Sequence, residues 1–416
     1  MDRRHFIRFA ALSAASGLIP IGRHAWALAP GNDTNTQRRM IVILLRGAVD
    51  GLNVVVPYRD TDYYRQRPTI AIPRPGTQGG AIDLDGQFGL HPALAGLRPL
   101  WEQRKLAFVH ASGSPDSTRS HFDAQDYIES GTPGVKNTPD GWMNRLVSSL
   151  PGKASPTRAV SIGPLLPRIL SGSATVTNLA LGAANGKPTL LDRPKVGDAF
   201  AQLYQGNDKL GQAYREAQSA HQEIMTSMSD DMQKEMQVAN GGAPLPNGLP
   251  NDAARLAAVL RNDRNIQLAF LSLGGWDTHA NQGASDGQLA NRLLPLGQGL
   301  ATLAERLGPL FDDTVIVVMS EFGRTAHENG NRGTDHGHGN AMWLMGGPVA
   351  GGKVYADWQG LAESHLHEGR DLPVTTDFRS VLAQVAERHL GLTDAQMDAL
   401  FPGMPSRMPS FQTIKS

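Results

Sequence analysis

The stretch that decides the fold class is RMIVILLRGAVDGLN, residues 39–53. Met40 to Leu45 form an unbroken apolar run. Such a run is typical of a central strand in a parallel sheet, because that strand is buried on both faces. The run ends at Arg46, and Asp50 follows it. In open α/β sheets ligands bind just beyond the strands' carboxyl ends, so Asp50 is a candidate site residue.

Other stretches repeat the strand pattern and alternate with helical ones. In residues 286–307 the leucines recur at spacings of three and four, and residues 377–391 begin with an acid and end with a glycine. This alternation predicts an α/β fold with a doubly wound, mostly parallel sheet flanked by helices. The further predicted strands are 105–113, 158–163, 266–275, 313–320 and 340–347.

Two segments stand outside this alternation. Residues 198–239 are polar and helix-prone, and NGGAPLPNGLP (240–250) interrupts them, which predicts a helical insertion at about 198–262 within a single domain spanning 37–416. Residues 1–29 carry Arg3-Arg4, a short apolar run and an A-x-A site, which predicts a twin-arginine signal peptide. The alternative is an amphipathic N-terminal helix. A signal peptide implies the twin-arginine translocase as an export partner, a periplasmic or secreted product, and no stable membrane span.

Composition narrows the chemistry. The 416 residues include 39 Lys+Arg and 39 Asp+Glu, so a net charge of zero argues against a nucleic-acid-binding surface. The chain has no cysteine, which excludes disulfides, thiol catalysis and cysteine-ligated metals. Any bound metal must therefore be held by histidine, carboxylate, hydroxyl or backbone oxygen.

Acids, hydroxyls and histidines follow most of the predicted strands, and a further group precedes the last one. Because carboxyl ends of parallel strands share one edge of a sheet, these side chains are expected to gather there. Imidazole with carboxylate suits zinc, manganese or iron. The candidates are Asp50; Ser117, Ser120 and His121 in SPDSTRSHFDAQD (114–126); Asp277 and His279 in WDTH; Glu321; and Asp335, His336 and His338 in RGTDHGHG (332–339).

Each candidate also has a purely structural interpretation. Asp50 fits a turn, Asp277 and Glu321 fit helix caps, and the glycine-rich DHGHG fits a flexible loop with solvated histidines. The His365 and His367 pair lies in a charged, loop-like stretch and is interpreted as solvated. The joint pattern across several strand ends favours a site over independent turns.

The motifs LLRGAVDGLNVVVPY, TRSHFDAQDYIESG, LGGWDTH, MSEFGRT and GTDHGHGNAMWLMGG resemble those of the exported proteins grouped as domain of unknown function 1501. The resemblance runs from about residue 39 to 402. That family is similar in fold to the alkaline phosphatase superfamily, which includes phosphatases, phosphodiesterases, sulfatases and cofactor-independent phosphoglycerate mutases.

The resemblance implies a site with one or two divalent metals, zinc or manganese. Asp277 and His279 would bind the first metal with His336 or His338, and Asp335 would bind it or orient a ligand. Asp50 and Glu321 would bind the second, although Phe322 stands where the superfamily has a histidine. The superfamily's usual D-x-x-x-H spacing is D-x-H here.

The nucleophile stays open between two hydroxyls. Spacing to His121 favours Ser117, and the RSH motif favours Ser120. His121 follows Ser120 directly, so it suits holding substrate or metal better than acting as that serine's base. C-x-P-x-R and S-x-P-x-R are absent, which argues against a formylglycine sulfatase. Candidate oxyanion clamps are Arg119, Arg46 and Arg324, each of which could instead pair with a carboxylate.

Two functions follow from these patterns. The first is a periplasmic metal-dependent hydrolase of a phosphate or sulfate ester, with a small-molecule, glycan or lipid-linked substrate. The second is a non-catalytic exported protein that keeps the fold and binds a metal or a partner.

Overall fold

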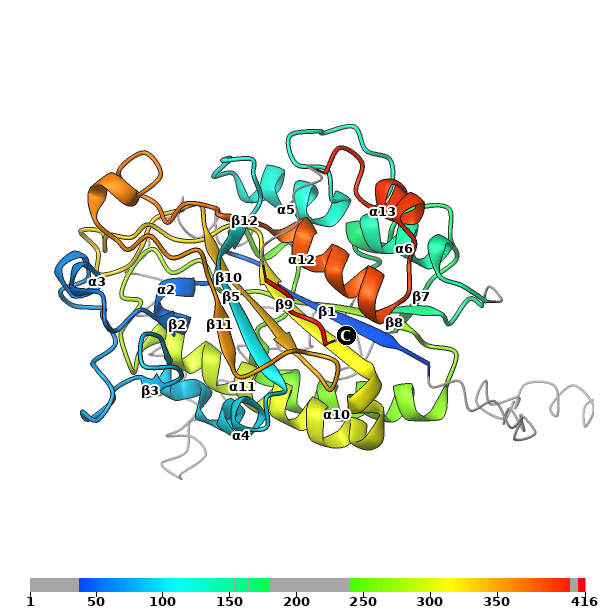
Figure 1. The fold of residues 1–416 in the computed structure, drawn as a ribbon, viewed down its shortest axis with the longest axis horizontal. Helices are drawn as coiled ribbons and strands as arrows, with labels where there is room; N and C mark the ends of the chain where they lie inside the picture. The colour runs from blue at the N-terminus through cyan, green and yellow to red at the C-terminus, as the bar shows by residue number, and fades with distance from the viewer. Residues whose placement is uncertain (1–36, 153–154, 164, 180–238, 405–410, 416) are drawn as a thin grey trace, which may run out of the picture. The chain divides into compact units, whose positions relative to one another are not determined.

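The computed structural model describes residues 37–152, 155–163, 165–179, 239–404 and 411–415. Gln37–Ser416 forms one compact unit (Figure 1). The predicted signal peptide and most of the predicted insertion lie outside the described residues. No helix in the described ranges is long and apolar enough to cross a membrane.

In the described ranges, the large sheet is mixed and has nine strands, in the order β11-β5-β10-β9-β1-β8-β6-β7, with β12 beside β5. The strands that the sequence predicted are all present, and the fold class is confirmed as a mostly parallel sheet flanked by helices. The predicted strands correspond to β1 (Arg39–Leu45), β5 (Leu106–Gly113), β6 (Ala159–Ile162), β8 (Leu268–Leu273), β9 (Thr314–Ser320) and β10 (Asn340–Met345). The sheet also contains three short strands that the sequence did not predict: β7 (Thr177–Leu179), β11 (Lys353–Tyr355) and β12 (Thr376–Asp377). A second sheet joins β2 (Val55–Val56), β4 (Gly89–Leu90) and β3 (Ile82–Asp83).

Strand β10 runs against its neighbours, and this direction matters for the site. It is antiparallel to both β5 and β9, while β9 is parallel to β1 and β1 to β8. The start of β10 therefore lies beside the carboxyl ends of the strands around it. Residues that precede β10 thus reach the same edge as residues that follow β1, β5, β8 and β9.

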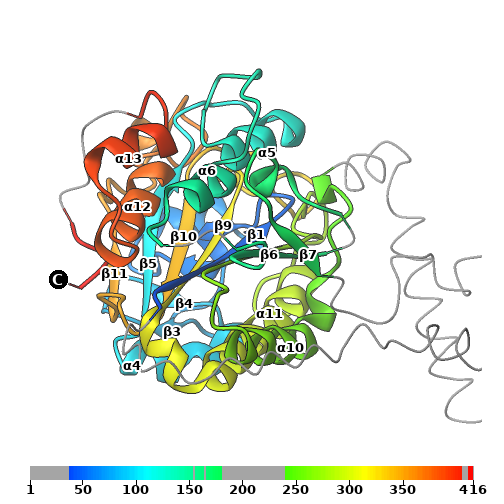
Figure 2. The same cartoon turned by 90° about the vertical axis from the view of Figure 1, so that its right-hand side faces the viewer.

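Helices cover both faces of the large sheet (Figures 1 and 2). The helices α4 (Arg98–Glu102), α10 (Leu249–Asn262) and α11 (Gln288–Leu307) lie on one face, and α5 (His121–Ser130), α6 (Trp142–Ser149), α12 (Phe378–Gln384) and α13 (Asp394–Leu400) lie on the other. The short helices α2 (Gly51–Val54) and α3 (Thr61–Gln66) lie beyond the end of β1. The predicted helix at 286–307 is confirmed as α11, and the one at 377–391 corresponds to α12 with a π-helical turn, Val385–His389.

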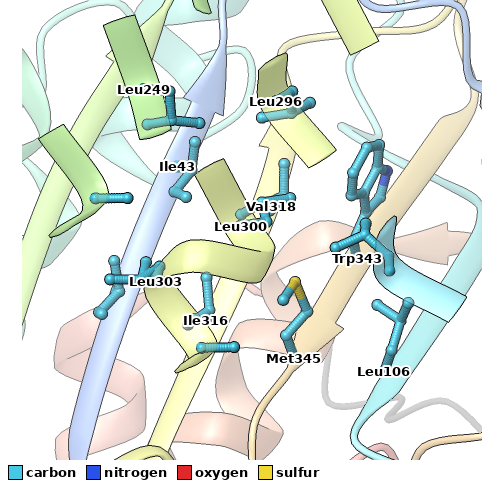
Figure 3. Packing of buried hydrophobic residues seen from close by; sticks show 14 of the residues in the cluster. Ile43, Leu106, Leu249, Leu296, Leu300, Leu303, Ile316, Val318, Trp343 and Met345 are labelled. Atoms are coloured by element: carbon cyan, nitrogen blue, oxygen red, sulfur yellow. The ribbon is translucent and has the colours of Figure 1, made fainter. Parts of the chain in front are cut away.

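The core consists of two layers, because alternate side chains of a strand point to opposite faces. Ile41 and Ile43 of β1 pack in the layer that holds α10 and α11, and Met40 and Val42 pack in the layer that holds α6, α12 and α13. Figure 3 shows Leu296, Leu300 and Leu303 of α11 in the same packed layer as Ile43 and Val318. Helix α10 comes from the region predicted as an insertion, yet its Leu256 belongs to this same layer. Both layers pack against the sheet and so position its edge.

Candidate metal centre

Five side chains from four segments meet at the carboxyl edge of the sheet. Asp277 and His279 follow β8, Glu321 follows β9, and His121 opens α5 after β5. His336 comes from the loop before β10, which its antiparallel direction brings to this edge. The sequence predicted this gathering, and the structure brings these residues together.

The ligand-type atoms of these residues face one another. His336 Nε2 lies 3.0 Å from His121 Nε2 and 2.9 Å from His279 Nε2. Asp277 Oδ1 lies 3.0 Å from His279 Nε2, 3.3 Å from His336 Nε2 and 3.6 Å from His121 Nε2. His121, Asp277 and His336 form a group whose atoms could hold one metal ion.

The hydrogen bonds of Nδ1, the second nitrogen of each ring, indicate which ring nitrogen carries the proton. His121 Nδ1 lies 2.8 Å from Glu321 Oε1, His279 Nδ1 lies 3.2 Å from Asp335 Oδ1, and His336 Nδ1 lies 2.8 Å from the Arg119 carbonyl. All three partners are acceptors, so each Nδ1 donates. A neutral imidazole that donates from Nδ1 carries a lone pair on Nε2. Three lone pairs and a carboxylate oxygen therefore point into one small volume.

That arrangement suits a metal cation. Zinc–nitrogen bonds of 2.0–2.1 Å in a tetrahedron place neighbouring ligand atoms about 3.4 Å apart, close to the separations observed here. Nδ1 hydrogen bonds to carboxylates or carbonyls are also the usual way in which proteins orient metal-binding histidines. The donor set therefore fits a zinc-like or manganese-like ion.

The charges of the site are strongly coupled. Burial opposes ionisation of Asp277, but Arg324 and the three histidines hold its pKa well below the ordinary range. Burial also disfavours the Glu321 carboxylate, yet hydrogen bonds from His121 and Gln125 lower its pKa to about 2. Burial opposes charge on His121, and its bonds to Asp277 and Glu321 outweigh burial and raise its pKa to about 9. Without a metal, a proton on His121 relieves the lone-pair repulsion.

Arg324 fixes the acid at the centre of the site. Its buried guanidinium pairs with Asp277 Oδ1 and donates to the carbonyls of Ala48 (2.7 Å), Gly47 (2.7 Å) and Thr334 (3.0 Å). With its donors directed to backbone and Asp277, Arg324 positions that carboxylate, and this matches the paired alternative considered for it. Arg46, likewise, bonds to Gln125 and Glu129.

The glycines of RGTDHGHG have a steric role. A Cβ on Gly333 would lie 2.4 Å from the His279 carbonyl carbon and oxygen, and one on Gly337 would lie 2.4 Å from those of Arg324. The loop packs backbone to backbone against both segments, which only glycine permits. This contact sets His336 beside His279.

Asp50 belongs to a different network, although it also follows a central strand. Its Oδ2 accepts from Arg67 (2.5 Å) and from Gln282 (2.6 Å), and its side chain is fully buried. In the described part of the chain no hydrogen bond joins Asp50 to the histidines. Its proposed role as a second metal ligand stays a prediction.

His338 also points away from Asp277. Its Nε2 lies 2.9 Å from the Ser114 carbonyl, while His336, two residues earlier, joins the cluster. Of the two histidines in DHGHG that the sequence left as alternatives, the structure brings only His336 to Asp277. Asp335 and Glu321 contact the outer nitrogens of His279 and His121, where they orient these rings.

The predicted hydroxyls lie at the start of α5. Ser120 is exposed and caps the helix, accepting from the Asp123 amide at 3.4 Å. Ser117 is also exposed. Arg119 pairs with Asp371 (2.8 Å) and Glu368 (2.6 Å), and its side chain is 31% exposed. The roles of these residues as nucleophile and clamp stay predictions.

Several contributors were not found from the sequence. Gln125 donates to Glu321, Arg67 neutralises Asp50, and Arg370 donates to the His336 carbonyl. Each of them is a single polar residue in a helix or loop. No sequence spacing distinguishes such a residue from an ordinary surface residue. Phe322, noted only as a missing histidine, packs its ring 4.8 Å from that of His121 and forms an apolar wall.

Comparison with known proteins places the chain in a family. The family model described as "Protein of unknown function (DUF1501)" matches residues 104–401. The chain belongs to this family. No protein among curated sequences matches this DUF1501 member.

Several solved structures are similar to this chain at low identity and with low TM-scores. One is Ps i-CgsB in complex with k-i-k-neocarrahexaose (TM-score 0.42, 11% identity, 87% of this chain and 74% of that chain). Another is a protein in the alkaline phosphatase superfamily from Vibrio parahaemolyticus (0.35, 10%, 77% and 62%). A third is the PsFucS1 sulfatase from Pseudoalteromonas sp. (0.36, 13%, 89% and 70%).

Proposed function

We propose that this DUF1501 protein is an exported, metal-dependent hydrolase of a phosphate or sulfate ester. The observation that carries the proposal is the convergence of three imidazole Nε2 atoms on Asp277 Oδ1, with each Nδ1 engaged by an acceptor. Zinc or manganese suits this donor set. The substrate class is a small-molecule, glycan or lipid-linked ester.

The residues of the site have three different proposed roles: binding the ion, orienting the histidine rings and positioning Asp277. His121, His279, His336 and Asp277 would hold the ion, which when bound supplies positive charge for an ester oxygen and lowers the pKa of a nearby water or hydroxyl. Glu321, Asp335 and the Arg119 carbonyl keep the three rings in the tautomer that leaves Nε2 free. Arg324 holds Asp277 ionised and in place.

The start of α5 is the proposed position for the ester's anionic group. The first backbone N–H groups of a helix attract anions, and His121 is the first residue of this ten-residue helix. Ser120, one residue earlier, is the proposed nucleophile, with Ser117 as the alternative. Arg119 is exposed enough to contact an ester oxygen from the same segment.

A second candidate function rests on a specific observation. Asp50 is already neutralised by Arg67, and the Ser120 hydroxyl already caps α5. Asp50 and the Ser120 hydroxyl thus already have the partners that a purely structural role requires. This favours a metal-binding protein without turnover.

Turnover and metal content together separate the two functions. Metal-free protein is loaded with Zn²⁺ or Mn²⁺ and assayed with nitrophenyl phosphate, bis-nitrophenyl phosphate and nitrophenyl sulfate. Ester hydrolysis that Ser120→Ala removes without loss of metal supports the hydrolase and its nucleophile; Ser117→Ala is the matched comparison. Stoichiometric metal with no turnover on all three esters leaves the binding function.

Export is a separate part of the proposal. Arg3-Arg4 and the following A-x-A site support the twin-arginine route. Replacing both arginines by lysine is expected to retain the chain in the cytoplasm, which cell fractionation measures. Full periplasmic yield of that variant would contradict this route.

A further inference from the structure

A second pair of histidines lies outside the cluster around Asp277. His338 precedes β10, and His367 lies in the loop between β11 and β12. Their ring centroids are 4.7 Å apart. The His279 and His336 rings in the candidate metal centre are separated by the same 4.7 Å.

Within the described residues, each of these two rings has a buried nitrogen without a hydrogen-bond partner. His338 Nε2 faces the Ser114 carbonyl at 2.9 Å, so Nε2 donates and Nδ1 carries a lone pair. That Nδ1 is buried and accepts no hydrogen bond, and His367 Nε2 is likewise buried without one. Buried polar atoms are rarely left unpaired, because burial removes the water molecules that would otherwise bond to them. His338 as a whole is only 7% exposed.

A carboxylate lies beside the pair. Glu368 Oε1 is 3.9 Å from His367 Nε2, beyond hydrogen-bond distance, while Glu368 Oε2 accepts from Arg119 at 2.6 Å. Glu368 also has a left-handed backbone, with φ of 54°, which is uncommon for a residue with a side chain. The loop is closed by reciprocal backbone hydrogen bonds between His367 and Asp371 (2.8 and 3.0 Å). This turn holds His367 against His338.

We propose that His338 and His367 form a second cation site, which takes a transition-metal ion such as Zn²⁺ and is separate from the cluster around Asp277. Unprotonated imidazole nitrogens are ligands that zinc, copper and nickel prefer. Glu368 and solvent complete the coordination. The ion ties the loop that carries His367 to the segment before β10. This site does not depend on the proposed hydrolase activity.

Zinc stoichiometry tests the proposal. Metal-free full-length chain is titrated with Zn²⁺ by calorimetry, and bound zinc is measured after gel filtration. The wild-type chain is expected to bind two equivalents and His367→Ala one. His365→Ala removes an exposed histidine from the same loop and serves as the matched control, with two equivalents expected. His338→Gln keeps a donor for the Ser114 carbonyl and is expected to bind one.

The outcomes distinguish the two sites. If His336→Ala removes one equivalent and His367→Ala removes the other, both sites stand. If His367→Ala and His338→Gln bind zinc as the wild type does, with near-wild-type circular dichroism, the second site is overturned whatever happens at Asp277. Zinc should also slow hydrogen exchange in residues 363–371 in the wild type but not in His367→Ala. Equal protection in both proteins would likewise contradict the proposal.

Discussion

Asp277 and Asp50 occupy similar places but have different partners. Each follows a central parallel strand, β8 and β1, and each has a fully buried side chain. Both acids also receive a buried arginine, Arg324 or Arg67. Asp277 also faces the Nε2 atoms of three imidazoles, whereas Asp50 faces the amide of Gln282. The end of the strand therefore determines where an acid lies. The side chains that surround the acid determine whether it can bind a cation.

The largest effect is expected from Asp277→Asn. This change removes the anionic ligand and leaves Arg324 without its carboxylate. Zinc affinity should fall at least ~100-fold, beyond the effect of losing an outer partner of a ligand. The unfolding free energy of the metal-free protein should fall by ~3–5 kcal/mol, because a buried charge loses its pair. Chelator competition and urea unfolding measure the two quantities. If this variant binds zinc with wild-type affinity, Asp277 is not a metal ligand and does not differ from Asp50 in that respect.

Asp50→Asn is the equivalent substitution at the acid that follows β1. It leaves Arg67, whose side chain is fully buried, without a counter-charge. The unfolding free energy should again fall by ~3–5 kcal/mol, while zinc stoichiometry and affinity stay at wild-type values. Urea unfolding and zinc analysis of folded protein provide the readout. Loss of a zinc equivalent here would make Asp50 a metal ligand, as the family resemblance implies.

The pH dependence of zinc binding tests whether His121 is one of the ligands beside Asp277. In the metal-free protein the pKa of His121 is raised to about 9, although burial opposes its charge. Metal needs the neutral ring, so below that pKa a proton must leave before the ion binds. Zinc affinity should therefore fall roughly tenfold for each unit that the pH drops below 9, and about one proton should be released per zinc. Calorimetry in buffers of different protonation enthalpy measures this release. Binding without proton release between pH 7 and 8 would count against His121 as a ligand.

The smallest effect is expected from Asp335→Asn. Asp335 accepts from His279 Nδ1 at 3.2 Å, but its side chain is 57% exposed. Water can replace part of this contact, so zinc affinity should fall by about tenfold, the low end for an outer partner. Chelator competition gives the value, and His327→Ala, an exposed histidine in the same region, is the control. A loss as large as that in Asp277→Asn would mean that Asp335 itself binds the ion.

Much of the fold follows from local sequence. The unbroken apolar runs of β1 and β9 and the leucine spacing of α11 determine their elements without reference to distant residues. The direction of β10 does not, because NAMWLM has the same buried pattern in either orientation. That direction matters, since it explains how residues before a strand reach the carboxyl edge.

The site was predictable to the level of segments. WDTH and Glu321 were expected at one edge because each follows a predicted strand, and DHGHG was expected there for its ligand-type residues although it precedes a strand. The sequence could not separate His336 from His338, because two residues in a glycine-rich loop differ only in the backbone path, which contacts with Arg324 and His279 determine. It also could not show that Arg67 lies beside Asp50, since 17 residues separate them and no period links them.

Anomalous diffraction from crystals grown with Zn²⁺ shows directly whether the cluster around Asp277 binds metal. We expect a strong zinc peak within bonding distance, ~2.0–2.2 Å, of Asp277 Oδ1 and of Nε2 atoms of His121, His279 and His336. Arg67 should remain paired with Asp50, with no peak between them. A zinc peak at Asp50, or none beside Asp277 in protein saturated with zinc, would contradict the account.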